Sequence, residues 1–231
     1  MRGEWTKART LASTAWLLAA TIVSGVGLTA AVCAVARYGI ADGQAPATLA
    51  FSGVQLAQAP AAMCGVQAVA GEYRSGLILT SLTVVPRRAI LVAAKVTIVS
   101  LLALAAAAVT VLGCQLVARV ELASAGSGTI HRLALDAEPT LRAMAAATLR
   151  LTFISVPAAG IALAVRSTAA ATAVVLSLLY LFPLAIRFTG SPTWQHRLEQ
   201  AAPATGSLGV LAAWAIASLL AGTLVLLMRD P

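Results

Sequence analysis

Acidic side chains and histidines, the groups that most often move protons in proteins, lie at or beyond the ends of the long apolar segments of this sequence. The chain has eight acidic residues, and its two histidines are His131 and His196. Carriers that are driven by a proton gradient usually keep an ionisable group inside the membrane, and acid–base catalysis needs a positioned carboxylate or histidine. The pattern therefore argues against a proton-driven carrier, although sodium coordination by backbone carbonyls stays possible.

Patterns for nucleophilic, metal or nucleotide chemistry are also missing. Cys33, Cys64 and Cys114 are an odd number without a CxxC or paired histidine spacing, which indicates small buried residues. The Gly–Ser cluster at 124–128 superficially resembles part of an intramembrane protease, but no histidine lies within an apolar segment to serve as its base. No GxxxxGK[ST] phosphate-binding loop occurs. We therefore predict that the chain is not an enzyme and carries no catalytic residue, metal site or nucleotide cofactor.

The composition requires an environment other than water for most of the chain. Of the 231 residues, 60% are hydrophobic and 10% are charged, and the mean hydropathy is +0.90. In soluble domains about a quarter of the residues are charged. Six apolar helices of about 20 residues would use about 120 positions. Because no polar stretch of domain size remains, we expect one membrane domain over residues 1–231.

The basic residues indicate membrane topology rather than nucleic-acid binding. The formal net charge is +8, and basic clusters attract phosphates. Here the lysines and arginines lie at the ends of apolar runs, where they anchor helices and set their orientation. No aromatic-rich basic element lies between them. We therefore expect a lipid bilayer, and not a nucleic acid, as the partner of this chain.

Runs without charged residues mark the expected membrane spans. Five such runs are 20 to 29 residues long, and a sixth is interrupted only by Arg150. The first run is too long for a secretory signal core of about 7 to 15 residues, so it counts as a span. The predicted fold class is an all-α integral membrane protein with six transmembrane helices, at residues 12–36, 47–70, 92–118, 143–165, 167–186 and 206–228.

Lysine and arginine counts orient these spans. With an internal N-terminus, nine basic residues lie on the cytoplasmic side and seven on the other side. The difference is small, but cytoplasmic loops of membrane proteins are enriched in lysine and arginine. The counts therefore predict a multi-pass protein with both termini in the cytoplasm.

Four polar residues inside the spans are candidates for a transport pathway. Gln55 and Gln58 lie in the second span, Arg150 in the fourth and Tyr180 in the fifth. An unpaired polar group in hydrocarbon is costly, so these side chains must face another helix, a second subunit or a wet cavity. Hydrogen bonding between helices is one explanation. The other is a mainly apolar passage with a few polar contacts, suited to an amphipathic or lipid-like molecule.

Arg150 is the one charge inside an expected span, and such residues are functional candidates by default. If Arg166 marks the inner boundary, Arg150 lies sixteen residues away, about 24 Å through a hydrocarbon core of about 30 Å. A long side chain at that depth can reach the outer surface. Two interpretations stay open: Arg150 lines the pathway, or it extends to the outer interface.

The segment 71–95, GEYRSGLILTSLTVVPRRAILVAAK, carries charges at both ends and mixes apolar with hydroxyl side chains between them. It is too short and too mixed to span a membrane. Both a short helix along the cytoplasmic face and an ordinary interfacial turn fit this pattern. The charged and aromatic residues that bracket it are Glu72, Tyr73, Arg74, Arg87 and Arg88.

This segment resembles the signature region of ABC-2 type transporter permeases, the membrane subunits of ATP-binding-cassette exporters. In that family an acidic, an aromatic and a basic residue precede a short coupling helix, which is followed by a Pro-Arg-Arg-like entry and a lysine in the third span. The N-terminal stretch GEWTKARTLASTAW is similar to actinobacterial members, in which it forms an interfacial helix. The resemblance covers the whole chain, and the loop at 119–142 is its least family-like part.

The resemblance implies a division of labour between subunits. A separate ATPase, which binds the ATP and the magnesium, would contact the coupling region at 71–91. This chain would pair with a second permease subunit, either identical or homologous. A short outer helix at 187–205 would precede the last span. The charged and aromatic residues of the N-terminal interfacial helix, at 1–11, would be Glu4, Trp5, Lys7 and Arg9.

Family frequency favours the efflux of a hydrophobic drug or natural product from a bacterial cell, and thus antibiotic resistance, with lipids, peptides or glycans as further substrates. The permease would sit in the plasma membrane and would perform no covalent chemistry. The alternative is a self-sufficient channel or gradient-driven carrier, in which the segment 71–95 merely turns the chain. Transport in liposomes without an ATPase would distinguish this alternative.

Overall fold

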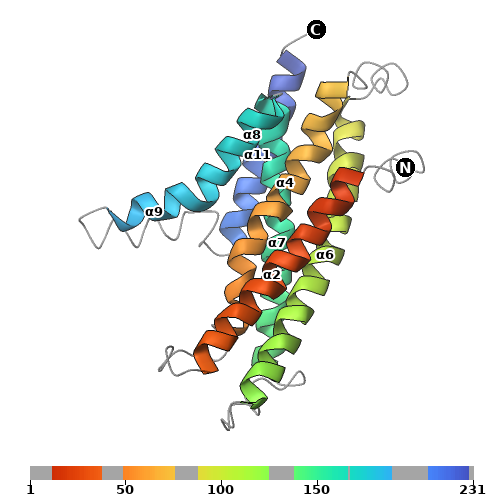
Figure 1. The fold of residues 1–231 in the computed structure, drawn as a ribbon. Coiled ribbons are helices and arrows are strands. Elements are labelled where there is room, and N and C mark those ends of the chain that lie inside the picture. The colour runs from red at the N-terminus through yellow and green to blue at the C-terminus, as the bar shows by residue number, and fades with distance from the viewer. Residues whose placement is uncertain are drawn as a thin grey trace.

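The computed structural model describes residues 12–37, 49–75, 88–124, 138–165, 167–188 and 208–228, and among these it has helices and no strand. The helices lie side by side in one bundle, from which the α9 segment diverges (Figure 1). In chain order they are α2 (Ala12–Arg37), α4 (Ser52–Ser75), α6 (Arg88–Ser124), α7 (Glu138–Val165), the continuous run of α8 (Thr168–Leu176), the π-helix η2 (Ser177–Leu181) and α9 (Phe182–Arg187), and α11 (Leu208–Met228).

Five of the described helices are long and apolar enough to cross a membrane, namely α2, α6, α7, the run from α8 to α9, and α11. This is the architecture of a multi-pass membrane protein. The second expected span, 47–70, falls on α4, which has the length but not the hydropathy of the other five. Its glutamines and Pro60 lower its apolar content, so length and composition alone do not establish a sixth span.

Several helices extend beyond the boundaries that charge-free runs predict. α4 continues to Ser75 rather than ending at 70, α6 continues to Ser124 rather than 118, and α7 begins at Glu138 rather than 143. Charged residues at a span end lie in the polar interfacial layer, where the backbone can stay helical. A charge therefore marks the edge of the hydrocarbon and not the end of the helix.

The expected coupling region is in part a continuation of its neighbouring helices. Residues 71–75, which include Glu72, Tyr73 and Arg74, form the end of α4, and Arg88 begins α6. Residues 76–87, with Arg87, lie outside the described residues, so a separate coupling helix stays a prediction. The same holds for the interfacial helix at 1–11 and for most of the outer segment at 187–205. Of the residues predicted there, Glu4, Trp5, Lys7 and Arg9 all lie outside the described residues.

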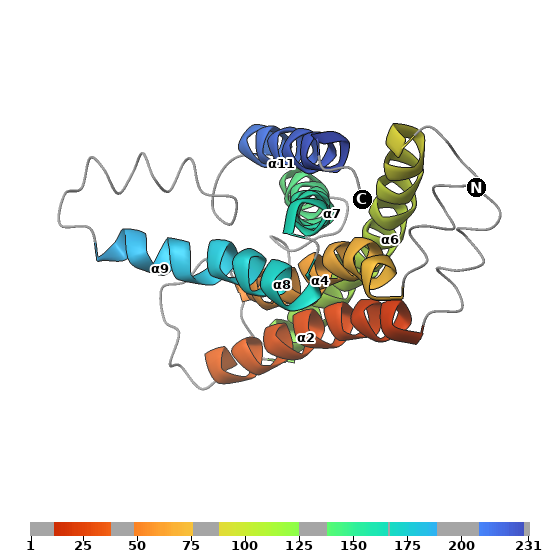
Figure 2. The ribbon, with the colours of Figure 1, turned by 90° about the horizontal axis from the view of Figure 1, so that it is seen from above.

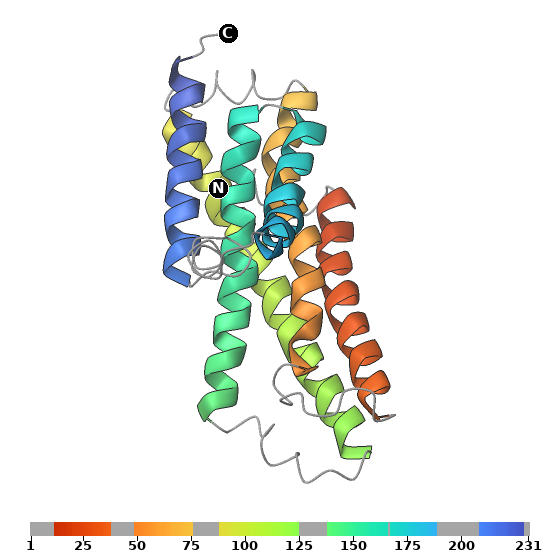
Figure 3. The same cartoon turned by 90° about the vertical axis from the view of Figure 1, so that its left-hand side faces the viewer.

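α4 is the central helix of the bundle. It contacts α2, α6, α7 and α8, and Figures 2 and 3 show it between α2 on one side and α7 on the other. It contributes Val54 and Ala57 to one apolar cluster and Ala62 and Val66 to another. Because other helices surround much of α4, its polar residues can lie inside the bundle.

Glycines let α4 approach its neighbours closely. A Cβ atom on Gly53 would overlap the carbonyl oxygen of Gly25 in α2, and one on Gly65 would overlap that of Ser155 in α7. The backbone N–H of Gly53 donates to the hydroxyl oxygen of Thr29 at 3.1 Å. Backbone N–H groups in the first turn of a helix have no partner in their own helix, so this bond satisfies one of them while joining α2 to α4. Close packing through small residues is typical of helices in lipid.

The prediction that the three cysteines are buried is confirmed. Cys33, Cys64 and Cys114 are at most 1% exposed, and none forms a disulfide. They come from α2, α4 and α6, where each fills a small space between packed helices.

We expect Gly53→Ala to destabilise the bundle, because the added methyl group collides with the α2 backbone, which cannot shift without moving the helix. Overpacking a well-packed position typically costs about 1–3 kcal/mol. The measurement is the midpoint of thermal unfolding of the purified protein in detergent. Gly27→Ala is the matched control, since a Cβ atom there meets nothing within 4 Å. An unchanged midpoint for Gly53→Ala would contradict the close contact.

Candidate functional site

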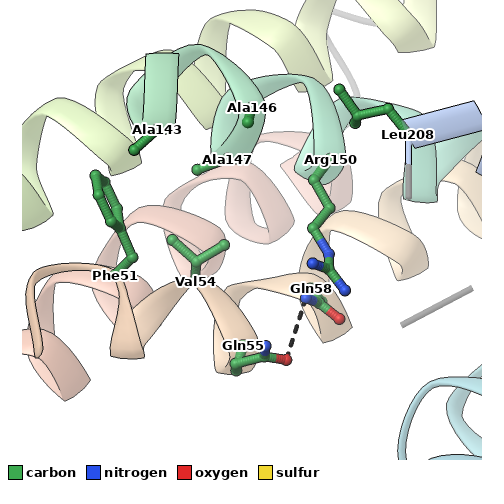
Figure 4. A pocket seen from close by; sticks show the side chains of 9 residues that line it. All are labelled: Phe51, Val54, Gln55, Gln58, Ala143, Ala146, Ala147, Arg150 and Leu208. Atoms are coloured by element: carbon green, nitrogen blue, oxygen red, sulfur yellow. Dashed lines mark hydrogen bonds between the residues drawn. The ribbon is translucent and has the colours of Figure 1, made fainter. Parts of the chain in front are cut away.

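A pocket of about 240 Å³ lies between the first turns of α4 and the first half of α7 (Figure 4). α7 contributes four residues at the spacing i, i+3, i+4, i+7, which is one face of a helix, and α4 together with Phe51, the residue before it, contributes four at the same spacing. The first residue of α11 completes the lining. The lining residues are Phe51, Val54, Gln55 and Gln58, then Ala143, Ala146, Ala147 and Arg150, and finally Leu208.

The pocket has a polar end and an apolar end. α4 and α7 both begin at the same end of the bundle (Figure 1), so their pocket faces run in the same direction. Gln58 and Arg150 therefore share one end of the pocket, and Phe51 and Ala143 share the other (Figure 4). Such a space can hold one polar group and one apolar group of the same molecule.

Arg150 brings a positive charge to the polar end, and none of the described acidic residues pairs with it. Its Nε and Nη2 atoms are buried, and neither has a hydrogen-bond partner in the part of the chain that the structure describes. Glu138, the acidic residue on the same helix, lies twelve residues earlier, about 18 Å along the axis. It pairs instead with Arg142 at the surface. An unpaired buried charge is unfavourable, and an anionic or polar group in the pocket would supply the partner that these two nitrogens lack among the described residues.

Arg150 lies near the midpoint of α7, a helix of 28 residues that begins at Glu138, five residues before the expected span. Its separation of sixteen residues from position 166 is unchanged, so the longer helix does not alter the depth expected for Arg150. Its side chain lines the pocket, with two guanidinium nitrogens inside the protein.

Two glutamines lie beside this guanidinium group. Gln58 is 1% exposed, whereas Gln55 is exposed. The Nε2 atom of Gln58 donates to Oε1 of Gln55 at 3.3 Å, one turn away on the same helix. This bond orders the two amides, so that α4 presents hydrogen-bonding groups next to the charge on α7.

Tyr180 does not line the pocket but contacts α4 beside it. Its hydroxyl donates to the carbonyl oxygen of Gln55 at 2.9 Å and to that of Leu56 at 3.5 Å. Leu56 stands four residues before Pro60, which has no N–H to offer that carbonyl. The longer of the two contacts therefore reaches the carbonyl that the proline leaves without its usual donor, in a bundle whose lipid surroundings would supply none.

A π-helical turn positions Tyr180. η2 covers Ser177–Leu181, and Pro183 follows in the first turn of α9. A proline inside a helix removes a backbone hydrogen bond and crowds the preceding turn, and π-turns inside helices are frequent at functional sites. α9 makes its main contacts with η2 and leaves the bundle beyond it (Figure 1).

Three of the four predicted pathway residues, Gln55, Gln58 and Arg150, meet in one pocket, and Tyr180 bonds the backbone of the first. The predicted coupling residues lie elsewhere, because Glu72 is fourteen residues beyond Gln58, about 21 Å along α4. Sequence reasoning did not identify the apolar lining, although the helical spacing from residue 143 to 150 could have indicated it.

Compared with protein-family models, with curated proteins and with solved structures, the chain has no match. The resemblance to ABC-2 type permeases therefore rests on the two motifs at 3–16 and 71–95. Among the described residues, no group of three or more histidine, cysteine or acidic side chains could hold a metal ion. The polar groups of the pocket are those of Arg150 and the two glutamines.

We expect Tyr180→Phe to lower the free energy of unfolding by about 0.5–1.5 kcal/mol, the usual net contribution of one hydrogen bond. The loss should shrink when Pro60→Ala is added, because the N–H of residue 60 can then bond the carbonyl of Leu56. A double-mutant cycle of unfolding in detergent measures this coupling. Strictly additive effects would contradict the link between the hydroxyl and the proline.

Proposed function

We propose that this chain is the membrane permease subunit of an ATP-driven exporter, which moves a hydrophobic or amphipathic molecule, such as a drug or natural product, out of a bacterial cell. The observation that carries the proposal is the pocket between α4 and α7. It is mainly apolar, has three polar side chains, and reaches the middle of a helix that is long and apolar enough to cross a membrane. Small-molecule sites usually combine apolar walls with a few placed polar groups.

Two features support α4 as a sixth span. α2 begins and α11 ends at the same end of the bundle (Figure 1), which fits an even number of crossings. α4 also contacts α2, α6 and α7, and Gln58 is buried among them. With six crossings both termini lie on one side, which the basic residues indicate is the cytoplasm.

The continuity of α4 supports coupling to a separate ATPase. Gln58 and Ser75 are seventeen residues apart on one helix, about 26 Å along its axis. A force applied at 71–91 would therefore tilt the pocket face of α4 against α7 as a rigid body and change access to the pocket. In this proposal the ATPase binds the ATP and magnesium, and a second permease subunit completes the pathway.

We expect Glu72→Lys to uncouple ATP hydrolysis from transport while the protein still inserts, because the reversed charge repels the surface that contacts the ATPase. When tagged wild-type chain is purified from its native membrane, a chain with a GxxxxGK[ST] loop should accompany it. The amount of ATPase that accompanies the variant should be at least about tenfold lower than with the wild type. The reason is that breaking a buried charge pair in an interface costs about 2–5 kcal/mol. Quantitative mass spectrometry of the two preparations measures the difference.

Glu138→Lys is the matched control for this charge reversal. Glu138 is exposed at the other end of the bundle, where it pairs with Arg142, and such surface pairs contribute about 1 kcal/mol or less. The control should retain the ATPase as the wild type does. A wild-type chain that retains no such partner, and that transports on its own in liposomes, would instead be a self-sufficient channel or carrier.

A further inference from the structure

The polar end of the pocket lacks one particular kind of partner. The two buried nitrogens of Arg150 without a hydrogen bond, Nε and Nη2, stand on the same edge of the guanidinium group. Their N–H bonds point in the same direction and form a planar fork. This fork matches two oxygens of a single carboxylate or phosphate.

The described part of this chain does not supply that oxyanion. Its acidic residues, Glu72, Glu121 and Glu138, all lie in the first or last turn of their helices. Glu138 lies twelve residues from Arg150, about 18 Å along α7, so in a second copy at the same depth in the bilayer it would lie at a different level from Arg150. Among the described residues no carboxylate reaches the fork, which leaves it open to a bound molecule.

The volume of the pocket limits how much of that molecule can enter. About 240 Å³ corresponds to about eight water-sized volumes of 30 Å³, and lies below the range of about 300–1,000 Å³ for pockets that enclose a drug-sized ligand. The space suits a head group with a few methylene groups, and Phe51 and Val54 would contact the latter. The rest of a long alkyl chain must lie outside the pocket, where the helices face lipid.

We infer that the pocket binds the oxyanion head group of an amphipathic molecule through the Nε–Nη2 edge of Arg150, with the amides of Gln55 and Gln58 beside it. This inference rests on the proposed function, because it makes the transported molecule an acidic amphipath. Two sources carry the required chemistry, a free carboxylate such as that of a fatty acid and the phosphate of a lipid. An acidic cargo also explains a positive charge in the middle of α7.

The test is binding to the purified chain, without any ATPase, in phosphatidylcholine nanodiscs at a pH at which carboxylates are ionised. Oleate is the probe, and oleamide is the neutral probe of equal chain length. Oleate should bind at least about tenfold more tightly than oleamide, because hydrogen bonds to charged groups are the stronger kind. Arg150→Gln should reduce oleate binding to the level of oleamide. The oleate affinity of Arg150→Lys should lie between those of the wild type and Arg150→Gln, since an ammonium group keeps the charge but lacks the two parallel N–H donors.

Arg142→Gln is the matched control, because it makes the same change two turns earlier on α7, at a side chain that is 79% exposed. It should bind oleate as the wild type does. A second arm replaces part of the nanodisc lipid with phosphatidylglycerol and counts by native mass spectrometry the retained phospholipid of both kinds, because phosphatidylcholine also carries a phosphate. Retention that depends on Arg150 identifies a lipid phosphate as the oxyanion, whereas selective oleate binding alone identifies a free carboxylate.

Equal affinity of the wild type for oleate and oleamide, with no phospholipid of either kind retained, would overturn the inference even if no Arg150 variant folds. A failure of this inference can be distinguished from a failure of the proposed function, because the binding assay contains no ATPase. A missing ATPase partner with intact oleate binding would refute the exporter alone. ATP-coupled transport without oxyanion binding would refute the acidic cargo alone.

Discussion

Lipid offers no hydrogen-bond partner to a polar group, and this constraint shapes most of the polar contacts in the bundle. The hydroxyls of Thr21 and Thr110 donate to carbonyls one turn back in their own helices, where they need nothing from the surroundings. The N–H of Gly53 finds Thr29 on a neighbouring helix, and Tyr180 reaches the carbonyls near Pro60. Arg150 is an exception, since two of its buried nitrogens have no partner among the described residues.

The same constraint accounts for the place of α4 at the centre. A helix with a glutamine and an internal proline would be destabilised if these polar groups faced lipid. When the helix lies among other helices, they can donate or accept the hydrogen bonds that the glutamine amide and the free carbonyl need. Glycines on its surface let those neighbours come close. The result is a helix that both forms the polar side of the pocket and continues without a break to the end of the bundle at Ser75. Ligand binding and an external mechanical input can therefore act on one rigid element.

Runs with few or no charges predicted where the long described helices lie, because helices that cross a membrane are long and apolar, and the boundary between the fourth and fifth runs fell at residues 165–167. In the structure Ser167 caps α8 there by accepting from the N–H of Ala170. Helix ends were less predictable, since helices continue into the interfacial layer, and α7 begins at Glu138 rather than at 143. The pocket itself could be predicted only in part from the sequence. Its polar members stand out in an apolar sequence, whereas the contact of Tyr180 with a backbone 125 positions away depends on how the helices pack.

The separation between the guanidinium group of Arg150 and the head group of a bound amphipath tests this picture most directly. Solid-state NMR can measure it with ¹⁵N-arginine in the protein and either oleate labelled with ¹³C at its carboxyl carbon or the ³¹P nucleus of phosphatidylglycerol. We expect a dipolar coupling that corresponds to ion-pair contact, within about 4 Å, and that disappears in Arg150→Gln. A coupling that survives in this variant, or none at saturating ligand in the wild type, would contradict the binding role of Arg150.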